Sequence, residues 1–150
     1  MIDLLQLAQA IGSVATAILV LITWQQVRQL KEQIRLSREQ ATTSIEDHLT
    51  QQYREVMRDI PIDIWLGSEL KELAPNPERQ NQCRDAIYRY IDLSQEQAFL
   101  HRRKRVTQET WIEWRSGIRS NMELPAFQEV WAQIEKKWPQ SFVELKEVLA

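Results

Sequence analysis

Two histidines and one cysteine are the residues of this sequence that most readily bind metals or carry acid–base chemistry. His48 follows Asp47, but adjacent residues of a helix point in different directions and cannot form a catalytic pair. Cys83 stands alone, which excludes an internal disulfide and a zinc cluster of cysteines. No other combination of these residues has the spacing of a metal site. We therefore predict no metal, no cofactor and no enzymatic activity.

A basic segment, residues 101–105, is the strongest candidate for ligand binding. Its cations Arg102, Arg103, Lys104 and Arg105 could hold the phosphate of a nucleotide, a nucleic acid or a lipid headgroup. They should also lower the pKa of His101 beside them. The alternative is a helix end whose carbonyl groups these cations complement before the chain enters solvent. We favour this second interpretation, because runs of like charge are usually solvated surface.

The remaining chemical candidates favour packing over catalysis. Glu109 and Glu113 are one helical turn apart and could share a proton or a cation, but no third ligand lies near them in sequence. We expect an exposed acidic face there. The tryptophans after residue 100 could stack on bases, but their helical spacing favours a hydrophobic core. The three glycines stand far apart, so the sequence lacks a glycine-rich phosphate loop.

An uncharged segment near the N-terminus predicts a membrane anchor, assigned to residues 1–26. From Leu4 to Trp24 there is no charged residue, and a helix of this length spans roughly 31 Å, the thickness of a bilayer's hydrocarbon core. Trp24 has the position of an interfacial indole. The first three residues lack the basic side chain of a cleaved signal peptide. A buried helix of a soluble protein is the remaining alternative, because Gln6 and Gln9 interrupt the apolar character.

The charges on either side of this segment predict its orientation. Four basic residues follow the segment within one short stretch, whereas only Asp3 precedes it. Positive residues beside a membrane helix usually stay in the cytoplasm, so we expect the N-terminus outside and the rest of the chain inside. The four cations would also contact anionic lipid headgroups. These residues are Arg28, Lys31, Arg35 and Arg38.

A seven-residue repeat, here called the heptad stripe, runs from the uncharged segment into the polar sequence. It holds most of the polar residues of the segment and then becomes apolar. Helices meet through small or polar faces in lipid and through apolar faces in water, so one face suits partners in both solvents. We predict self-association along one continuous helix, although a coil of two heptads is marginal alone. The face could instead meet a different protein or line a narrow aqueous path. The predicted association residues are Gln6, Gln9, Ser13, Thr16, Thr23, Val27, Leu30 and Ile34.

The rest of the chain predicts an all-α fold. Helical spacing continues to Pro61, giving a coiled-coil or connecting helix over residues 27–60. Residues 61–150 are expected to form a small bundle of four to five helices. Asn76-Pro77 predicts the start of a central, most buried helix. Further helices are expected to begin near Thr107, at Pro125 and at Pro139.

Three motifs stand in the C-terminal half of the chain: Tyr90-Ile91-Asp92-Leu93-Ser94-Gln95-Glu96, Trp111-x-x-Trp114-x-x-Gly117-Ile118 and Pro125-x-Phe127-x-x-x-Trp131. In these motifs the chain resembles an uncharacterised family of bacterial single-span membrane proteins with a small helical domain. The resemblance covers about residues 85–145 and implies the fold and the membrane anchor, but no activity and no functional residue. The bacterial inner (plasma) membrane is therefore the expected location.

These expectations together favour an interaction or scaffold protein that anchors and multimerises a cytoplasmic helical domain. Its expected partners are the lipid bilayer and further copies of the same chain. The alternative is a membrane effector or sensor whose domain binds an anionic ligand and whose polar helix face forms a pore. Nucleotides or nucleic acids are the less favoured ligands, since the net charge of −2 gives no general attraction for them.

Overall fold

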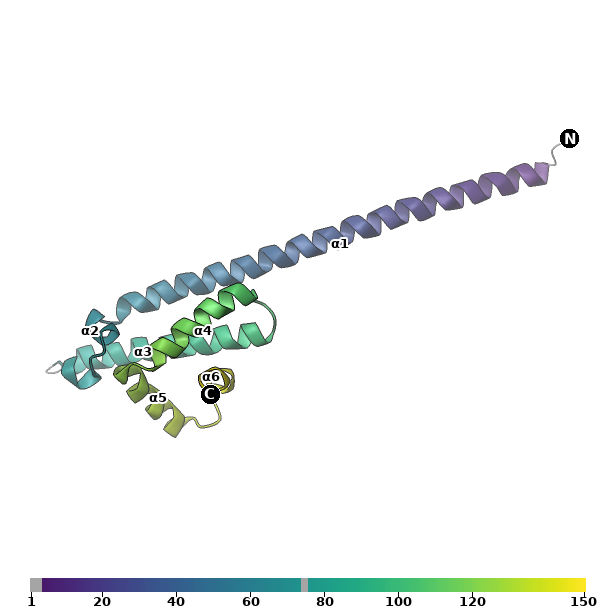
Figure 1. Cartoon of the computed structure of the whole chain (residues 1–150). Helices are drawn as coiled ribbons and strands as arrows, with labels where there is room; N and C mark the ends of the chain where they lie inside the picture. The colour runs from purple at the N-terminus through teal and green to yellow at the C-terminus, as the bar shows by residue number, and fades with distance from the viewer. Residues whose placement is uncertain (1–3, 74–75) are drawn as a thin grey trace. The chain divides into compact units, whose positions relative to one another are not determined.

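The structure, a computed structural model, describes residues 4–73 and 76–150, with side chains from Gly12 onward except Ser13 (Figure 1). Every regular element in these residues is helical and none is a strand, which confirms the predicted all-α class. The elements are α1 (Leu4–Asp59), α2 (Ile62–Trp65), the 3-10 helix η1 (Leu70–Leu73), α3 (Pro77–Arg102), α4 (Gln108–Met122), α5 (Pro125–Lys137) and α6 (Val143–Leu149).

The chain divides into two compact units, Met1–Ala41 and Thr42–Ala150. The second unit includes the last part of α1, which the sequence predicts to belong to the connecting helix of residues 27–60. The reason is local packing: Leu49, Val56 and Ile60 are buried in the core of that unit, and Ile45 and Tyr53 are partly buried against it.

Helix α1 is long because its sequence contains almost nothing that ends a helix. No proline occurs before Pro61 and the only glycine is Gly12. Arg35 forms ion pairs with Glu32 and Glu39, three residues before it and four after it. The helix ends at Asp59 because Pro61 lacks an amide hydrogen and disfavours helical geometry in the preceding residue.

The sequence predicts a membrane anchor near the N-terminus. Within the residues whose side chains are described, no helix is both long enough and apolar enough to cross a membrane. The predicted segment, Leu4 to Trp24, reaches beyond them, because the side chains of residues 4–11 and 13 lie outside the described part.

Helix α3 is the central helix of the second unit, as the sequence predicts. It contacts η1, α4, α5 and α6, and Ala86, Ile87 and Ile91 have no solvent exposure. The Asn76 side chain accepts hydrogen bonds from the amides of Glu78 and Arg79, at 3.0 and 3.2 Å. This cap and Pro77 at the first helical position define the start of the helix.

An aromatic cluster fills the middle of this core. The Tyr90 ring lies 5.2 Å from Phe127 and 6.2 Å from Trp65, centroid to centroid, with edge-to-face geometry in both pairs. Burial raises the pKa of Tyr90 to about 12, so its phenol is neutral and accepts a 2.8 Å hydrogen bond from Asn121 Nδ2. The cluster joins α2, α3, α4 and α5.

Helices α4 and α5 start where the sequence predicts. Thr107 caps α4 by accepting a hydrogen bond from the Thr110 amide, and its own amide donates to Glu46 Oε1 at 2.6 Å. Pro125 stands at the first turn of α5. Trp111 is buried and Trp114 and Trp131 are half-buried, in agreement with the prediction of core packing. The prediction is wrong for Trp138, which is 42% exposed because it follows the last residue of α5.

The start of α6 was predicted wrongly. The helix begins at Val143 rather than at Pro139. Phe142 before it has a left-handed backbone, with φ of 59°, which a continuing helix cannot accommodate. The Phe142 ring packs edge-on against Trp131 and Tyr88, at 5.9 and 6.4 Å, and this packing compensates for the unfavourable backbone.

Candidate functional site

The hydroxyl groups of the heptad stripe bond to their own helix. Thr16 Oγ1 donates to the Gly12 carbonyl at 2.9 Å, and Thr23 Oγ1 donates to the Leu19 carbonyl at 2.8 Å. This back-bonding satisfies each hydroxyl without a partner from outside the helix. Three further residues of the stripe lie outside the described side chains: Gln6, Gln9 and Ser13.

The apolar residues of the stripe are exposed. Val27, Leu30 and Ile34 have exposed fractions of 44, 56 and 45%. Together they form an apolar surface at the spacing of two helical turns, with no covering from the residues of their own unit. Surfaces of this kind are usually covered by another helix.

The stripe does not continue as the face that packs in the second unit. Its spacing would reach His48, Gln51 and Glu55, all of which are exposed. The buried positions are instead Leu49, Val56 and their neighbours. The packing of α1 in the second unit therefore uses a different set of positions and leaves the stripe positions exposed.

The end of the uncharged segment carries an aromatic–cation pair. The Arg28 guanidinium lies 5.5 Å from the centroid of the Trp24 ring, one turn away on α1. An indole beside a guanidinium is a common arrangement where a helix leaves a membrane, since both groups favour the interface.

The basic segment at residues 101–105 ends helix α3. Arg102 is the last residue of the helix, Arg103 is its C-cap, and Lys104 has a left-handed backbone with φ of 56°. The backbone amides of Lys104 and Arg105 donate to the His101 and Leu100 carbonyls, at 2.8 and 2.9 Å. This is the predicted helix end, with cations at the carbonyl terminus.

The cations of this segment have different surroundings. Arg102 Nη1 lies 3.4 Å from Glu144 and 3.6 Å from Glu147, both on α6. The Arg103 guanidinium lies 5.2 Å from the centroid of the Phe99 ring. Arg102 lines a surface hollow of about 350 Å³, and Arg103, Lys104 and Arg105 do not. An anion at Arg102 would therefore compete with two carboxylates.

His101 has the lowered pKa that the sequence predicts, but from other causes. Its ring stacks on the Trp111 indole at 4.4 Å, and the main cause of the lowered pKa is partial burial. The cation that contributes is Arg115 on α4, rather than a neighbour in the basic segment. The stacked imidazole is part of the packing between α3 and α4.

Neither His48 nor the pair of Glu109 and Glu113 belongs to a metal-binding group among the described residues. His48 Nε2 lies 3.1 Å from Gln52 Nε2, one turn along α1. Glu109 and Glu113 are exposed, as expected. Among the described residues, no group of three or more histidine, cysteine, aspartate or glutamate side chains is placed to hold a metal ion.

Two residues that hold α6 in place were not found from the sequence. Gln95 Oε1 accepts a hydrogen bond from the Leu145 amide, and Gln95 Nε2 donates to Glu144. Arg119 Nε donates to the Val148 carbonyl at 2.7 Å. Gln95 and Leu145 are 50 residues apart, so local spacing carries no signal of this contact.

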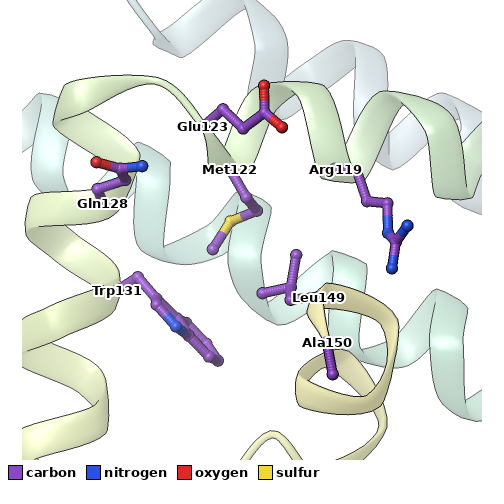
Figure 2. A pocket seen from close by; sticks show the side chains of 7 residues that line it. All are labelled: Arg119, Met122, Glu123, Gln128, Trp131, Leu149 and Ala150. Carbon is purple, nitrogen blue, oxygen red and sulfur yellow. The ribbon is translucent and has the colours of Figure 1, made fainter.

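A hollow of about 530 Å³ lies beside the end of α6 (Figure 2). Met122, Trp131 and Leu149 give it an apolar floor, and Arg119 of α4 and the C-cap residue Glu123 lie at its edge. The Arg119 guanidinium is already bonded to the α6 backbone. The hollow is shallow and open, and its polar groups do not converge on one point.

Comparison with protein-family models, curated proteins and solved structures found no match to this chain.

Proposed function

We propose that this protein is a membrane-anchored scaffold whose copies associate through the heptad stripe of α1 and present residues 42–150 in the cytoplasm. The observation that carries the proposal is the exposed apolar surface of Val27, Leu30 and Ile34, which follows hydroxyl residues of the same stripe. The proposal assigns two roles to α1: anchoring before residue 27 and association along the stripe.

Anchoring is supported by the absence of charge between Leu4 and Trp24 and by the internal bonding of the hydroxyl groups. A hydroxyl whose hydrogen bond is already made costs much less free energy to place in lipid. The Trp24–Arg28 pair supports an interface at this position. The cations that follow, Arg28 to Arg38, favour the cytoplasmic side for the rest of the chain.

Self-association is supported by the burial that these apolar residues lack within their own chain. Each would gain stabilisation from a second helix, because fully burying one aliphatic side chain is worth about 1.5–3 kcal/mol. In lipid, the threonines and Gly12 would allow close approach of two helices. One register then serves the membrane part and the aqueous part of the same assembly.

The anchoring role is tested by fractionation of cells that express the full chain. We expect the protein in the membrane pellet after extraction at alkaline pH, and release only with detergent. In spheroplasts that express the chain, a cysteine placed within residues 42–150 should react with an impermeant maleimide only after the spheroplasts are lysed. Recovery of the chain in the soluble fraction contradicts the anchor, and labelling before lysis contradicts the orientation.

The association role is tested by cysteine crosslinking in membranes. Cys83 is buried and burial raises the pKa of its thiol, so it reacts slowly; a Cys83→Ala background removes it altogether. Ser13→Cys and Leu30→Cys should form disulfide-linked dimers, whereas their neighbours Val14→Cys and Gln29→Cys serve as matched controls. Equal yields at stripe and control positions contradict the assigned face.

A conductance measurement separates this scaffold from the pore-forming effector. Liposomes that contain the full chain should show the same ion flux as empty liposomes, because a scaffold's polar stripe is covered by its partner helix. Flux that increases with the amount of protein contradicts the scaffold.

A further inference from the structure

A small cavity lies within the second unit, apart from the heptad stripe and the basic segment. Its volume is about 290 Å³, and it lies between the last part of α1, α3 and α4. One water molecule takes about 30 Å³, so the cavity has room for a ligand of roughly five to ten non-hydrogen atoms. Its lining residues are Thr50, Tyr53, Tyr90, Gln97, Glu113, Trp114, Gly117 and Ile118.

Gln97 offers a polar group to this cavity. The residue is only 4% exposed, and no described residue forms a hydrogen bond with its side chain. Its amide is not among the buried side-chain groups that lack a partner, so the amide reaches the solvent in the cavity. A ligand in the cavity can therefore replace water as the hydrogen-bond partner of this amide.

The other lining residues determine the charge of the ligand. Tyr53, Tyr90 and Trp114 supply aromatic surface, and the Tyr53 and Tyr90 rings lie 6.1 Å apart. Glu113 supplies an exposed carboxylate, and the lining contains no lysine or arginine. Aromatic faces and a carboxylate both attract cations, and the Thr50 hydroxyl can accept a hydrogen bond from one.

We propose that this cavity binds a small organic cation, an alkylammonium whose charged group lies against Trp114 and Glu113. The alkyl part packs on Tyr53 and Ile118, and Gln97 accepts a hydrogen bond from the ammonium group. The proposal is independent of the scaffold function, because every lining residue belongs to residues 42–150.

Gly117 offers a variant that blocks the cavity without disturbing the core. A Cβ atom at this position meets no atom within 4 Å, so a larger side chain has room. Gly117→Leu should fill part of the cavity and also raise the helix propensity of α4. Ser116→Leu, at the neighbouring exposed position of the same helix, is the matched control.

The experiment titrates the purified full chain, in a neutral detergent, with n-butylammonium and with 1-butanol. Binding is followed by the chemical shift of the Trp114 indole N–H, assigned through Trp114→Phe. We expect saturable binding of butylammonium in the millimolar range, and binding of butanol weaker by roughly fivefold or more. Equal binding of both probes, or shifts that do not saturate, would overturn the proposal and leave a cavity filled by water.

The variants decide which residues carry the binding. Glu113→Gln should weaken butylammonium binding about threefold, since an exposed carboxylate contributes little, whereas Glu109→Gln on the same helix should leave it unchanged. Gly117→Leu should abolish butylammonium binding, whereas the control Ser116→Leu should bind butylammonium like the parent chain. Gln97→Leu should weaken binding by roughly fivefold or more, with folding checked by circular dichroism. Unchanged affinity in both Glu113→Gln and Gly117→Leu would place the probe elsewhere and overturn the site.

Discussion

Apolar residues of the same types are exposed in one unit of this chain and buried in the other. In Met1–Ala41, Leu30 and Ile34 are exposed on one face of a single helix. In Thr42–Ala150, Ile87 and Ile91 have no exposure and lie among four other elements. An apolar residue contributes to stability only where something covers it. The second unit supplies its own covering, whereas these apolar residues of the first unit stay exposed.

This difference also separates folding from assembly. Changes in the core of the second unit should act on its free energy of unfolding. Changes in the stripe of the first unit should act on the association of copies and leave that free energy unaltered.

The largest effect is expected from Phe127→Ala in the second unit. Phe127 has no exposure and its ring lies 5.2 Å from Tyr90 and 5.3 Å from Trp65. Removing such a ring leaves a cavity and should lower the free energy of unfolding by about 3–5 kcal/mol. Urea denaturation followed by circular dichroism measures the loss. A change below about 1 kcal/mol would contradict the described core.

The next effect concerns assembly and is expected from Ile34→Asp. A carboxylate on the stripe would have to be desolvated between two helices, which should weaken association by roughly tenfold or more. Sedimentation of the full chain in mild detergent measures the association. The thermal midpoint of the second unit should stay the same, because Ile34 lies outside it. Exposed Gln33→Asp, on an adjacent position, is the control. If both variants weaken association equally, the added charge is the cause and the position on the stripe is not.

A smaller effect on folding is expected from Asn76→Ala. This change removes the side-chain oxygen that caps α3 and leaves two backbone amides without that partner. The free energy of unfolding should fall by about 1 kcal/mol, as for other helix caps. Denaturation of Asn76→Ser, which retains a capping oxygen, should recover most of the loss. If serine and alanine destabilise equally, capping is not the source of the effect.

The smallest effect is a pH dependence that involves Glu144. The Gln95 hydrogen bond and the Arg102 charge hold its pKa below the ordinary value of 4.5. A carboxyl group whose pKa is lowered by folding stabilises the folded state above about pH 4.5, and this contribution is lost as the pH falls through the lowered pKa. Glu144→Gln should therefore cost less than about 1 kcal/mol at pH 7 and nothing at pH 2. A difference from the parent chain that grows on acidification would contradict this assignment.

Much of the helical fold could be predicted from local sequence signals. Pro61 ends α1, Asn76 and Pro77 start α3, Thr107 starts α4 and Pro125 starts α5 because capping and proline act on the nearest backbone groups. The start of α6 could not be predicted in this way. It depends on Phe142 packing against Tyr88 and Trp131, which lie far away in sequence.

The candidate sites were harder to predict from the sequence, because most of their contacts join residues that lie far apart in the chain. The heptad stripe could be found because its residues recur along one helix. The engagement of Arg102 by Glu144 and Glu147 joins residues more than 40 positions apart. The cavity around Gln97 collects residues from three helices, and nothing in the spacing of Thr50, Gln97 and Glu113 indicates that they meet.

The central claim is that the stripe of α1 is covered by another copy of the chain, and the mass of the solubilised protein tests it most directly. The full chain should be extracted in mild detergent and its protein mass measured by light scattering with correction for bound detergent. The account predicts a defined multiple of the 17.8 kDa chain, which Ile34→Asp shifts towards a single chain. A parent protein that runs as a single chain at every concentration would contradict it.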